Sequence, residues 1–470
     1  MKSKKLRDAF TYVSDKNLDR ADTYRKVRNP KWVRWTALAA CLCLIVGIAL
    51  WRRPGGTEPD DPGTAFVSAE PSTQVGYGIV TSAAYPEKDG GSLDQQTLAA
   101  LKPFLRESCV QLLSETDGEN VIYSPLNIYM GLSMLAESTG GETQKQLMDV
   151  LGVDSTETLR DRAGALWRAN HFTKENDTSL LANSLWLDES LDYVEDGVQE
   201  LARDYYASAF HGKMGSEEYD QALRDWLNEQ TRGLLGEQTE GVGLDPNTVL
   251  ALVSTVYFEA KWKQQFYEGS NDEKIFTMAD GSTVDCTFMN TMIEERHYRG
   301  DSFDAVALPL TNGERMWFLL PMEGSSPESL AADERLMELL TSPDDWADSS
   351  DALVNFSVPK FDITSKIDLV EKLKATGVTD ILDSDISNFS PILTGEQKVR
   401  LSEAEHAVRV KIYEEGVTAA AYIEMEAAAE EALEMPEEID FVLDRPFLFA
   451  ITSRHDLPLF LGVVNDPTDK

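Results

Sequence analysis

The chain has 470 residues, of which 42% are hydrophobic, enough to bury the core of one large domain or of two or three smaller ones. Its formal net charge of -38 disfavours binding to nucleic acid, because the phosphate backbone would repel it. A cationic partner, or solubility outside a cell, fits this charge better.

The chain begins with a basic segment, residues 1–31, in which many Lys and Arg residues face only four Asp residues. Residues 32–53 follow as an apolar run, and its uncharged part from Trp35 to Trp51 has about 17 residues. This length is near the lower limit for a membrane-spanning helix, and the flanking tryptophans and arginines suit the membrane interface. Because Lys and Arg are concentrated before the run, we expect a single-pass signal anchor in the cell membrane, with a cytoplasmic N-terminus and an extracellular remainder.

Two other interpretations of the apolar run are a cleaved signal peptide and a lipoprotein signal. A signal peptide would have a shorter apolar core ending in small residues, whereas this run continues through residues 48–50 without a clean cleavage site. The sequence LAAC at residues 38–41 resembles a lipoprotein processing box, but most of the apolar stretch lies after its cysteine. An uncleaved transmembrane helix is therefore favoured. An anchor of this kind favours a bacterial source.

Residues 54–91 are rich in Pro, Gly, Ser, Thr and acidic residues and show little periodicity, which predicts a flexible extracellular linker. Ser92 then precedes a stretch whose apolar residues recur at helical spacing. We therefore expect one globular domain over residues 92–470.

A search of this domain for catalytic and ligand-binding motifs is mostly negative. The sequence has no HExxH, GxSxG, Walker or CxxC motif, and its five histidines lack a second ligand type at metal-binding spacing. Cys109 and Cys286 are isolated, so no essential disulfide is expected. Acidic residues are so abundant that a catalytic carboxylate pair can be neither singled out nor excluded. We therefore expect neither an enzyme nor a bound metal or cofactor.

The domain instead contains a series of segments that resembles the serpin family of serine protease inhibitors. The first is NVIYSPLNIYMGLSMLAESTGGETQKQLMDVLG, and the others follow in the family's order. The six segments are residues 120–152, 179–189, 248–266, 354–382, 401–421 and 441–467. A single motif such as DRPF would be weak evidence for the family, but six segments in the family's order are specific to it. The resemblance implies an α+β serpin fold, with three β-sheets, eight or nine helices and an exposed reactive-centre loop in a metastable state.

The resemblance also gives a role to EEGVTAAAYIEMEAAAEEALEMPEEIDF, residues 414–441, which lies between two strand-like stretches. It corresponds to the reactive-centre loop, a bait that the target protease cuts. In this family the cut loop then inserts as a new central strand of the largest sheet and carries the protease with it as a trapped acyl-enzyme.

The residues of the loop can be tested against insertion independently of the family. A strand that enters a sheet must alternate, because its side chains point to opposite faces. One alternate series of the loop is apolar throughout: Val417, Ala419, Ala421, Ile423, Met425 and Ala427. The intervening residues are polar, aromatic or small. A solvent-facing helix, which the Ala and Glu content also allows, is the competing interpretation.

The start of the loop matches the hinge of inhibitory serpins through Glu414 and Gly416, where the glycine supplies backbone freedom. Val417 departs from the threonine often found there, but it is small and β-branched. No charge or proline occupies the first inward positions, where either would oppose insertion. The full hinge is Glu414, Gly416, Val417, Thr418, Ala419, Ala420 and Ala421.

The bond that the protease cuts can be placed by two counts that disagree. Counting forward from the hinge by the family's usual loop length gives Glu430–Glu431, whereas counting back from RPF gives Met435–Pro436. The forward count is favoured, because the distance from the hinge fixes where an inserted strand leaves the protease. A glutamate suits a protease with a basic specificity pocket, and Ala429 would suit an elastase-like enzyme.

The resemblance assigns a gating cluster beneath the insertion gap to Ser124, Asn127, Ser254 and His406. Many relatives have serine at the second position and asparagine at the third, so this sequence exchanges them. Both side chains donate and accept, so a hydrogen-bond cluster with the histidine survives the exchange. Trp262 matches a tryptophan near the insertion end of the gap, although core packing would also explain it.

The sequence therefore predicts a monomeric, membrane-tethered serpin that irreversibly traps an extracellular serine protease, with a cysteine protease as the alternative target. The alternative is a non-inhibitory serpin-fold binding protein. An extracellular hydrolase would need an active site that the sequence does not reveal.

Overall fold

The computed structural model describes residues 38–50 (as backbone), 77–83, 85, 91–173, 178–233, 242–311, 313–395, 397–414 and 437–469. They fall within one unit of the chain, Ala37–Lys470. The predicted reactive bond and the hinge after Glu414 lie outside the described residues.

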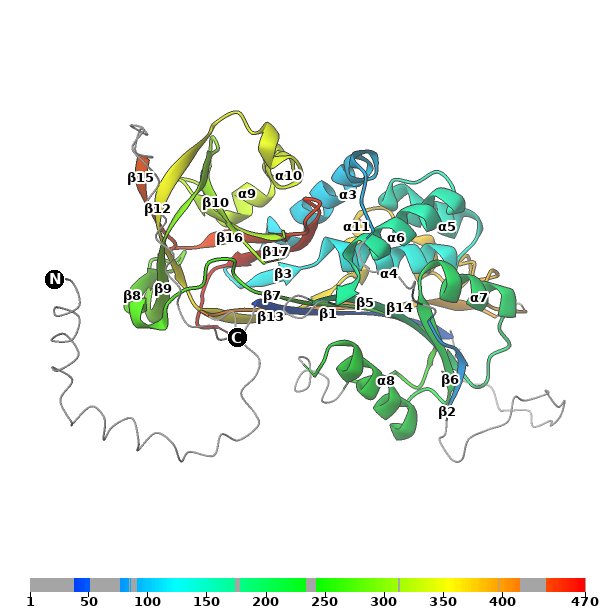
Figure 1. The fold of residues 1–470 in the computed structure, drawn as a ribbon. Coiled ribbons are helices and arrows are strands. Elements are labelled where there is room, and N and C mark those ends of the chain that lie inside the picture. Colours follow the sequence, from blue (N-terminus) through cyan, green and yellow to red (C-terminus); the bar gives the residue numbers. More distant parts are fainter. Residues whose placement is uncertain are drawn as a thin grey trace, which may run out of the picture. The chain divides into compact units, whose positions relative to one another are not determined.

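An eight-stranded sheet forms the base of this unit (Figure 1). Its strand order is β13-β14-β1-β7-β5-β6-β2, and β4 pairs with β5. The strands are β13 (Phe361–Asp368), β14 (Val399–Ile412), β1 (Leu38–Leu50), β7 (Thr248–Ala260), β5 (Thr178–Asp188), β6 (Ala207–Gly212), β2 (Tyr77–Thr81) and β4 (Phe172–Thr173). Strand β1 is central, and it runs antiparallel to both β14 and β7.

The remaining described strands form a nine-stranded network with two parts. Strand β9 (Thr283–Arg299) connects the two parts. One part consists of β15 (Glu437–Val442), β12 (Ser349–Pro359), β9 and β8 (Asp272–Thr277). The other consists of β10 (Phe303–Pro309), β11 (Arg315–Pro321), β16 (Phe447–Thr452), β17 (Pro458–Val464) and β3 (Val121–Tyr123). With the base sheet, these parts correspond to the three sheets that the sequence predicts.

Nine α-helices occur among the described residues, in agreement with the expected eight or nine. They are α3 (Gln95–Leu113), α4 (Pro125–Glu137), α5 (Gly141–Leu151), α6 (Thr156–Asn170), α7 (Glu195–Asp204), α8 (Glu217–Gln230), α9 (Pro327–Ala331), α10 (Glu334–Thr341) and α11 (Val370–Ala375). Helix α8 lies on one face of the base sheet, and α4 lies on the other (Figure 1). The side chains of Asp94, Ser124 and Ser216 accept backbone N–H groups and thereby define where α3, α4 and α8 begin.

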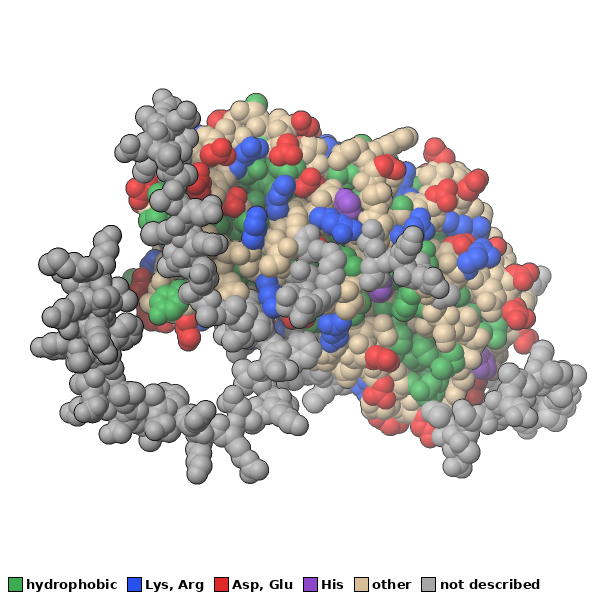
Figure 2. All heavy atoms as spheres, in the orientation of Figure 1, with side chains coloured by type: hydrophobic (Ala, Val, Ile, Leu, Met, Phe, Trp, Pro, Cys, Tyr) green, Lys and Arg blue, Asp and Glu red, His purple; other side chains and the backbone are tan. Residues whose placement is uncertain are grey.

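The central strand β7 is apolar on both faces because each face is covered. Leu252 and Val256 belong to the main hydrophobic core, on the side of α4. Val253 and Tyr257 belong to a second cluster, which includes Leu223 of α8. On the molecular face shown in Figure 2, acidic and basic side chains are interspersed.

The structure differs from the transmembrane helix expected over residues 32–53, because Leu38–Leu50 form strand β1. Among the described residues, no helix is both long and apolar enough to cross a membrane. A continuous apolar run is compatible with a buried strand as well as with a buried helix, since periodicity alone does not separate the two. The backbone groups of this run are paired with neighbouring strands in the sheet.

Some residues before Ser92 also belong to the domain. Strand β2 (Tyr77–Thr81) pairs with β6 at the edge of the base sheet, and Gly91 N–H donates to the carbonyl of Arg168 at 2.7 Å. Of the expected linker, residues 77–83, 85 and 91 are therefore part of the fold. Five residues at a sheet edge are too few to give a clear periodic pattern, so the sequence did not indicate this strand.

Candidate functional site

The four residues predicted to form a gating cluster come together at the centre of the base sheet, on the face that α4 covers. The backbone N–H of Ser124 donates to Nε2 of His406 at 3.0 Å, and the Ser124 hydroxyl accepts the N–H of Asn127 at 3.2 Å. Nδ2 of Asn127 donates to the Ser254 hydroxyl at 3.4 Å. All four residues are buried. Their role in gating stays a prediction.

Three elements bring this cluster together. Ser124 caps the N-terminus of α4, Pro125 occupies the first turn of that helix, and Asn127 follows in the same turn. His406 lies on β14 and Ser254 on β7, and both are opposite Leu44 of β1 in the strand register. The cluster therefore spans the slot that separates β14 from β7.

His406 is held in its neutral form. Burial lowers the pKa of its imidazole to about 3. Since Nε2 accepts a hydrogen bond, the ring proton resides on Nδ1. Among the described residues, neither Nδ1 of His406 nor Oδ1 of Asn127 has a hydrogen-bond partner. The cluster thus retains one unused donor and one unused acceptor.

The end of β14, where the predicted loop begins, is fixed by a second set of contacts. Nε1 of Trp262 donates to the carbonyl of Tyr413 at 3.0 Å, and the Trp262 ring packs edge-on against Phe266. The indole therefore lies beside the end of β14, and its role at the entry point of the loop stays a prediction. The same contacts also bury Trp262 in the core, so packing and positioning coincide.

Glu414 is the hinge residue that the structure describes. Only 8% of it is exposed, and its carboxylate pairs with Nζ of Lys360 at 2.5 Å and accepts a hydrogen bond from Asn271. Burial acts to raise the pKa of Glu414, but the hydrogen bonds from Lys360 and Asn271 outweigh it and hold the pKa below its usual value. The carboxylate is therefore ionised and tied to residues outside β14.

Lys360 and Asn271 are functional candidates that the sequence did not reveal. Lys360 follows the end of β12, and Asn271 directly precedes β8, so both are far from Glu414 in the chain. A single basic or amide residue carries no spacing signal. Only the packing of β12 and β8 beside the end of β14 makes these contacts visible.

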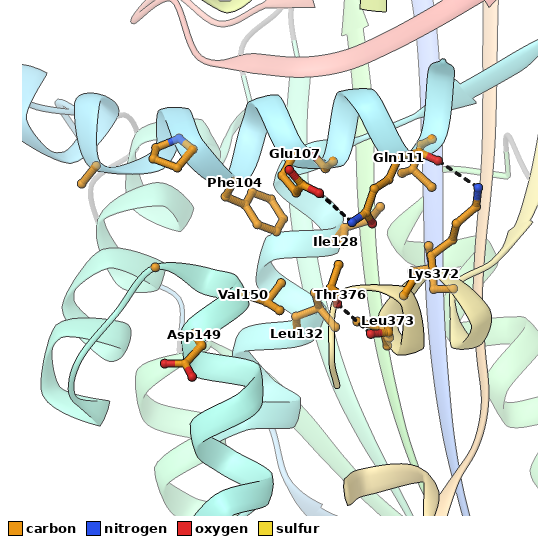
Figure 3. Close-up of a pocket in the computed structure, with 17 residues that line it drawn as sticks. Phe104, Glu107, Gln111, Ile128, Leu132, Asp149, Val150, Lys372, Leu373 and Thr376 are labelled. Atoms are coloured by element: carbon orange, nitrogen blue, oxygen red, sulfur yellow. Dashed lines mark hydrogen bonds between the residues drawn. The ribbon is translucent and has the colours of Figure 1, made fainter. Parts of the chain in front are cut away.

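A cavity of about 600 Å³ lies near the gating cluster, between α3, α4, α5 and α11 (Figure 3). Phe104, Ile128 and Leu132 contribute to its apolar lining. At its rim, the Gln111 amide donates to Glu107 at 2.9 Å, and Nζ of Lys372 donates to the Gln111 carbonyl at 2.9 Å. Ile128 and Leu132 belong to α4, whose first turn carries the gating residues. The described residues contain no group of three or more side chains that could hold a metal ion.

Comparison with known proteins agrees with this architecture. The family model for "Serpin (serine protease inhibitor)" matches residues 104–467. Serpin-Z1A of Triticum aestivum is 27% identical over 394 residues, covering 80% of this chain and 96% of the relative. Plasminogen activator inhibitor 1 of Sus scrofa is 26% identical over 371 residues, covering 76% of this chain and 89% of the relative.

Among solved structures, the thermophilic serpin tengpin in its native state superposes with a TM-score of 0.68 at 23% identity. The match covers 83% of this chain and 99% of tengpin. The fold expected from the sequence is therefore confirmed. Because the family model spans more than three quarters of the sequence, the chain belongs to the serpin family.

Proposed function

We propose that this protein is an irreversible inhibitor of an extracellular serine protease, acting through cleavage of its reactive-centre loop and insertion of that loop into the base sheet. Membership of the serpin family supports a protease inhibitor over a catalyst. A cysteine protease is a second possible target class. The inhibitor acts once and as a monomer.

The observation that carries this proposal is the slot between β7 and β14. It accommodates a strand of 13 residues, β1, which pairs antiparallel with both neighbours. A loop that leaves the end of β14 at Glu414 and turns back would run antiparallel to β14, in the same direction as β1. The position of β1 in the base sheet therefore suits the strand that the mechanism needs, provided that β1 has left it.

Strand length supports a cut at Glu430–Glu431. Strand β14 has 14 residues, and the loop from Val417 to Glu430 has the same number. At about 3.3 Å per residue, a loop cut there would extend along the full length of β14. A cut at Met435–Pro436 would leave five further residues beyond the sheet. Neighbouring cuts, such as the one after Ala429, would differ little in length.

The test uses the full chain reconstituted in lipid vesicles and two probe enzymes, a glutamate-specific serine protease and pancreatic elastase. We expect a covalent complex that survives denaturing electrophoresis and a released C-terminal fragment. If the glutamate-specific enzyme cuts the favoured bond, the mass of this fragment will show that it starts at Glu431. Cleavage of the loop by both enzymes without any complex would reject the inhibitory function.

We also propose that residues 32–53 anchor the protein in a cell membrane of bacterial type, with residues 1–31 in the cytoplasm and the serpin domain outside. In this form residues 38–50 leave the sheet and become helical, because helix formation satisfies their backbone groups within the bilayer. The full chain should then resist carbonate extraction, and external protease should release the domain by cutting within residues 54–76. A soluble chain that starts after Cys41, or one that carries lipid there, would contradict the anchor.

A non-inhibitory binding protein is the second candidate, and the occupied slot favours it. In the structure β1 already completes the base sheet, so a loop cut in this state has no gap to enter. The apolar cavity beside α4 would then be the natural ligand site. The two candidates differ in whether loop cleavage stabilises the domain.

A further inference from the structure

The strand register shows how completely β1 fills the central slot. Its pairing with β14 runs from Ala39 opposite Lys411 to Leu50 opposite Val399. Its pairing with β7 runs from Leu38 opposite Ala260 to Ala49 opposite Thr248. In Figure 1, β1 is the dark blue strand that runs between β14 and β7. Within the described strands, the slot is thus closed on both sides along almost its whole length.

The sequence of β1 suits this position in a way that a membrane anchor does not require. Its residues alternate in size along the strand. One series is large with a single exception, Leu38, Ala40, Leu42, Leu44, Val46, Ile48 and Leu50. The other is small with a single exception, Ala39, Cys41, Cys43, Ile45, Gly47 and Ala49. A helix in a bilayer has no use for a period of two, whereas a strand with two different faces does.

The register places each series on the matching face of the sheet. Leu42 is opposite Val408 and Val256, which both belong to the main core. Leu44 is opposite the gating residues His406 and Ser254. The large series therefore shares a face with the main core. A shift of one residue would exchange the two faces, so the register is a specific one.

The small series of β1 shares the other face of the sheet. Cys41 is opposite Arg409 of β14, and Cys43 is opposite Ala407. Both β14 residues are only half-buried. The small series is therefore opposite the β14 residues that are less covered, and the large series is opposite the buried ones.

We infer that residues 38–50 are an internal competitor of the reactive loop for the slot between β7 and β14, and hence a brake on inhibition. This inference rests on the proposed function, because only an inserting loop needs the slot. The competition follows from geometry, since the loop would enter in the same direction and between the same two strands. Two strands cannot both occupy one position in a sheet.

The size of the two apolar series indicates which strand prevails. The inserted loop would bring the series Val417, Ala419, Ala421, Ile423 and Met425 to the core face, whereas the series of β1 that is opposite core residues consists mainly of Leu, Val and Ile. Because burial stabilises in proportion to apolar area, β1 is the stronger occupant when it is free to enter. A protease that cuts the loop in that state leaves without being trapped. Insertion of residues 38–50 into a bilayer opens the slot, so anchoring switches inhibition on.

Occupancy of the slot can be tested with a native cysteine of β1. Cys43 is opposite Ala407, and directly opposed residues in antiparallel strands approach within disulfide range. The full-length Ala407→Cys variant, oxidised without lipid or detergent, should form a 43–407 disulfide that mass spectrometry identifies. The matched control combines Ala407→Cys with Cys43→Ser and should form none. The Ala407→Cys variant bound to vesicles should also form little of the 43–407 disulfide.

The effect on inhibition can be tested with two aspartates in β1. Leu44→Asp introduces a charge at the register position opposite the buried His406, whereas Ala39→Asp introduces one opposite Lys411 at the end of the strand. Each substitution adds a charge that opposes insertion of residues 38–50 into a bilayer, so the two variants are matched in their effect on anchoring. Without lipid, Leu44→Asp should raise the fraction of protease trapped by about tenfold or more over the parent, because a buried unpaired charge expels β1. Ala39→Asp should trap as little as the parent.

Failure of this inference is separable from failure of the proposed function. Absence of the 43–407 disulfide, together with equal trapping by the parent in solution and on vesicles, would overturn the competition alone. If the disulfide forms but vesicle-bound protein traps neither probe protease, the inhibitory function fails and the competition fails with it. Equal trapping by Leu44→Asp and Ala39→Asp would also reject the competition.

Discussion

At the scale of single residues, His406 makes the stability of the fold depend on pH. Its pKa is lowered to about 3 by burial, whereas in the unfolded chain it lies near 6.5. Below pH 6.5 the unfolded state therefore binds a proton that the folded state does not, so stability falls as the pH falls from 6.5 toward 3. Above pH 6.5 this contribution is fully present.

The predicted loss from His406 at pH 4.5 is on the order of 2–3 kcal/mol of unfolding free energy. Denaturant unfolding at pH 7 and pH 4.5 measures it as the difference between the parent and His406→Gln, which cannot take up the proton. Equal pH dependence in parent and His406→Gln would show that the imidazole is not held neutral.

Glu414 is the second residue for which the structure predicts a clear effect. Glu414→Gln keeps the shape and the contact with Asn271 but removes the charge that pairs with Lys360. We expect a loss of about 1–3 kcal/mol at pH 7, as is typical of hydrogen bonds to charged groups. Glu405→Gln, whose partner Lys366 is exposed, should cost about 0–1 kcal/mol. Urea titration of both variants checks the difference, and equal losses would show that the base of the loop is not held by this pair.

At the scale of elements, the alternation of the loop predicts which of its residues tolerate charge. Ala419→Arg would bring an unpaired charge into the core face during insertion, whereas Thr418→Arg would bring the same charge to the opposite face. On vesicle-bound chain, Ala419→Arg should be cleaved without trapping the protease, and Thr418→Arg should trap it as the parent does. The ratio of covalent complex to cleaved inhibitor measures this, and equal ratios would contradict strand insertion.

Elements also differ in how far the sequence predicts them. Helix α3 begins at Gln95, close to the start expected after Ser92, because its apolar residues recur at helical spacing. Strand β1 was expected as a helix, because an apolar run of this kind suits either state and its neighbours decide between them. Strand β2 gave no signal, since its stability comes from pairing with β6.

At the scale of the whole molecule, loop cleavage should change heat stability only when the slot is free. Insertion buries Val417, Ile423 and Met425, each worth about 1.5–3 kcal/mol, and adds a paired central strand. In Leu44→Asp, a nick between Met425 and Met435 should therefore raise the Tm by roughly 10 °C or more. In the parent without lipid the nick should leave the Tm nearly unchanged, because β1 already fills the sheet. Scanning calorimetry measures both, and no rise in either protein would favour the binding function.

The sequence by itself determined the family and, through that resemblance, the three-sheet fold. The resemblance rests on motifs in a fixed order, which can be recognised without knowledge of contacts. It also named Ser124, Asn127, Ser254 and His406, although their hydrogen bonds join three separate elements. The family motifs that contain these four residues made the prediction possible, whereas the spacing between the residues did not.

Only the tertiary structure decided which segment occupies the centre of the base sheet and what holds the start of the loop. The pair Lys360–Glu414 joins residues that follow the ends of two different strands, and no local pattern encodes such a contact. Likewise, residues 38–50 are apolar enough for a bilayer and alternate in size as a sheet requires. Their state is set by which partner satisfies their backbone groups, and strands β7 and β14 do so in this structure.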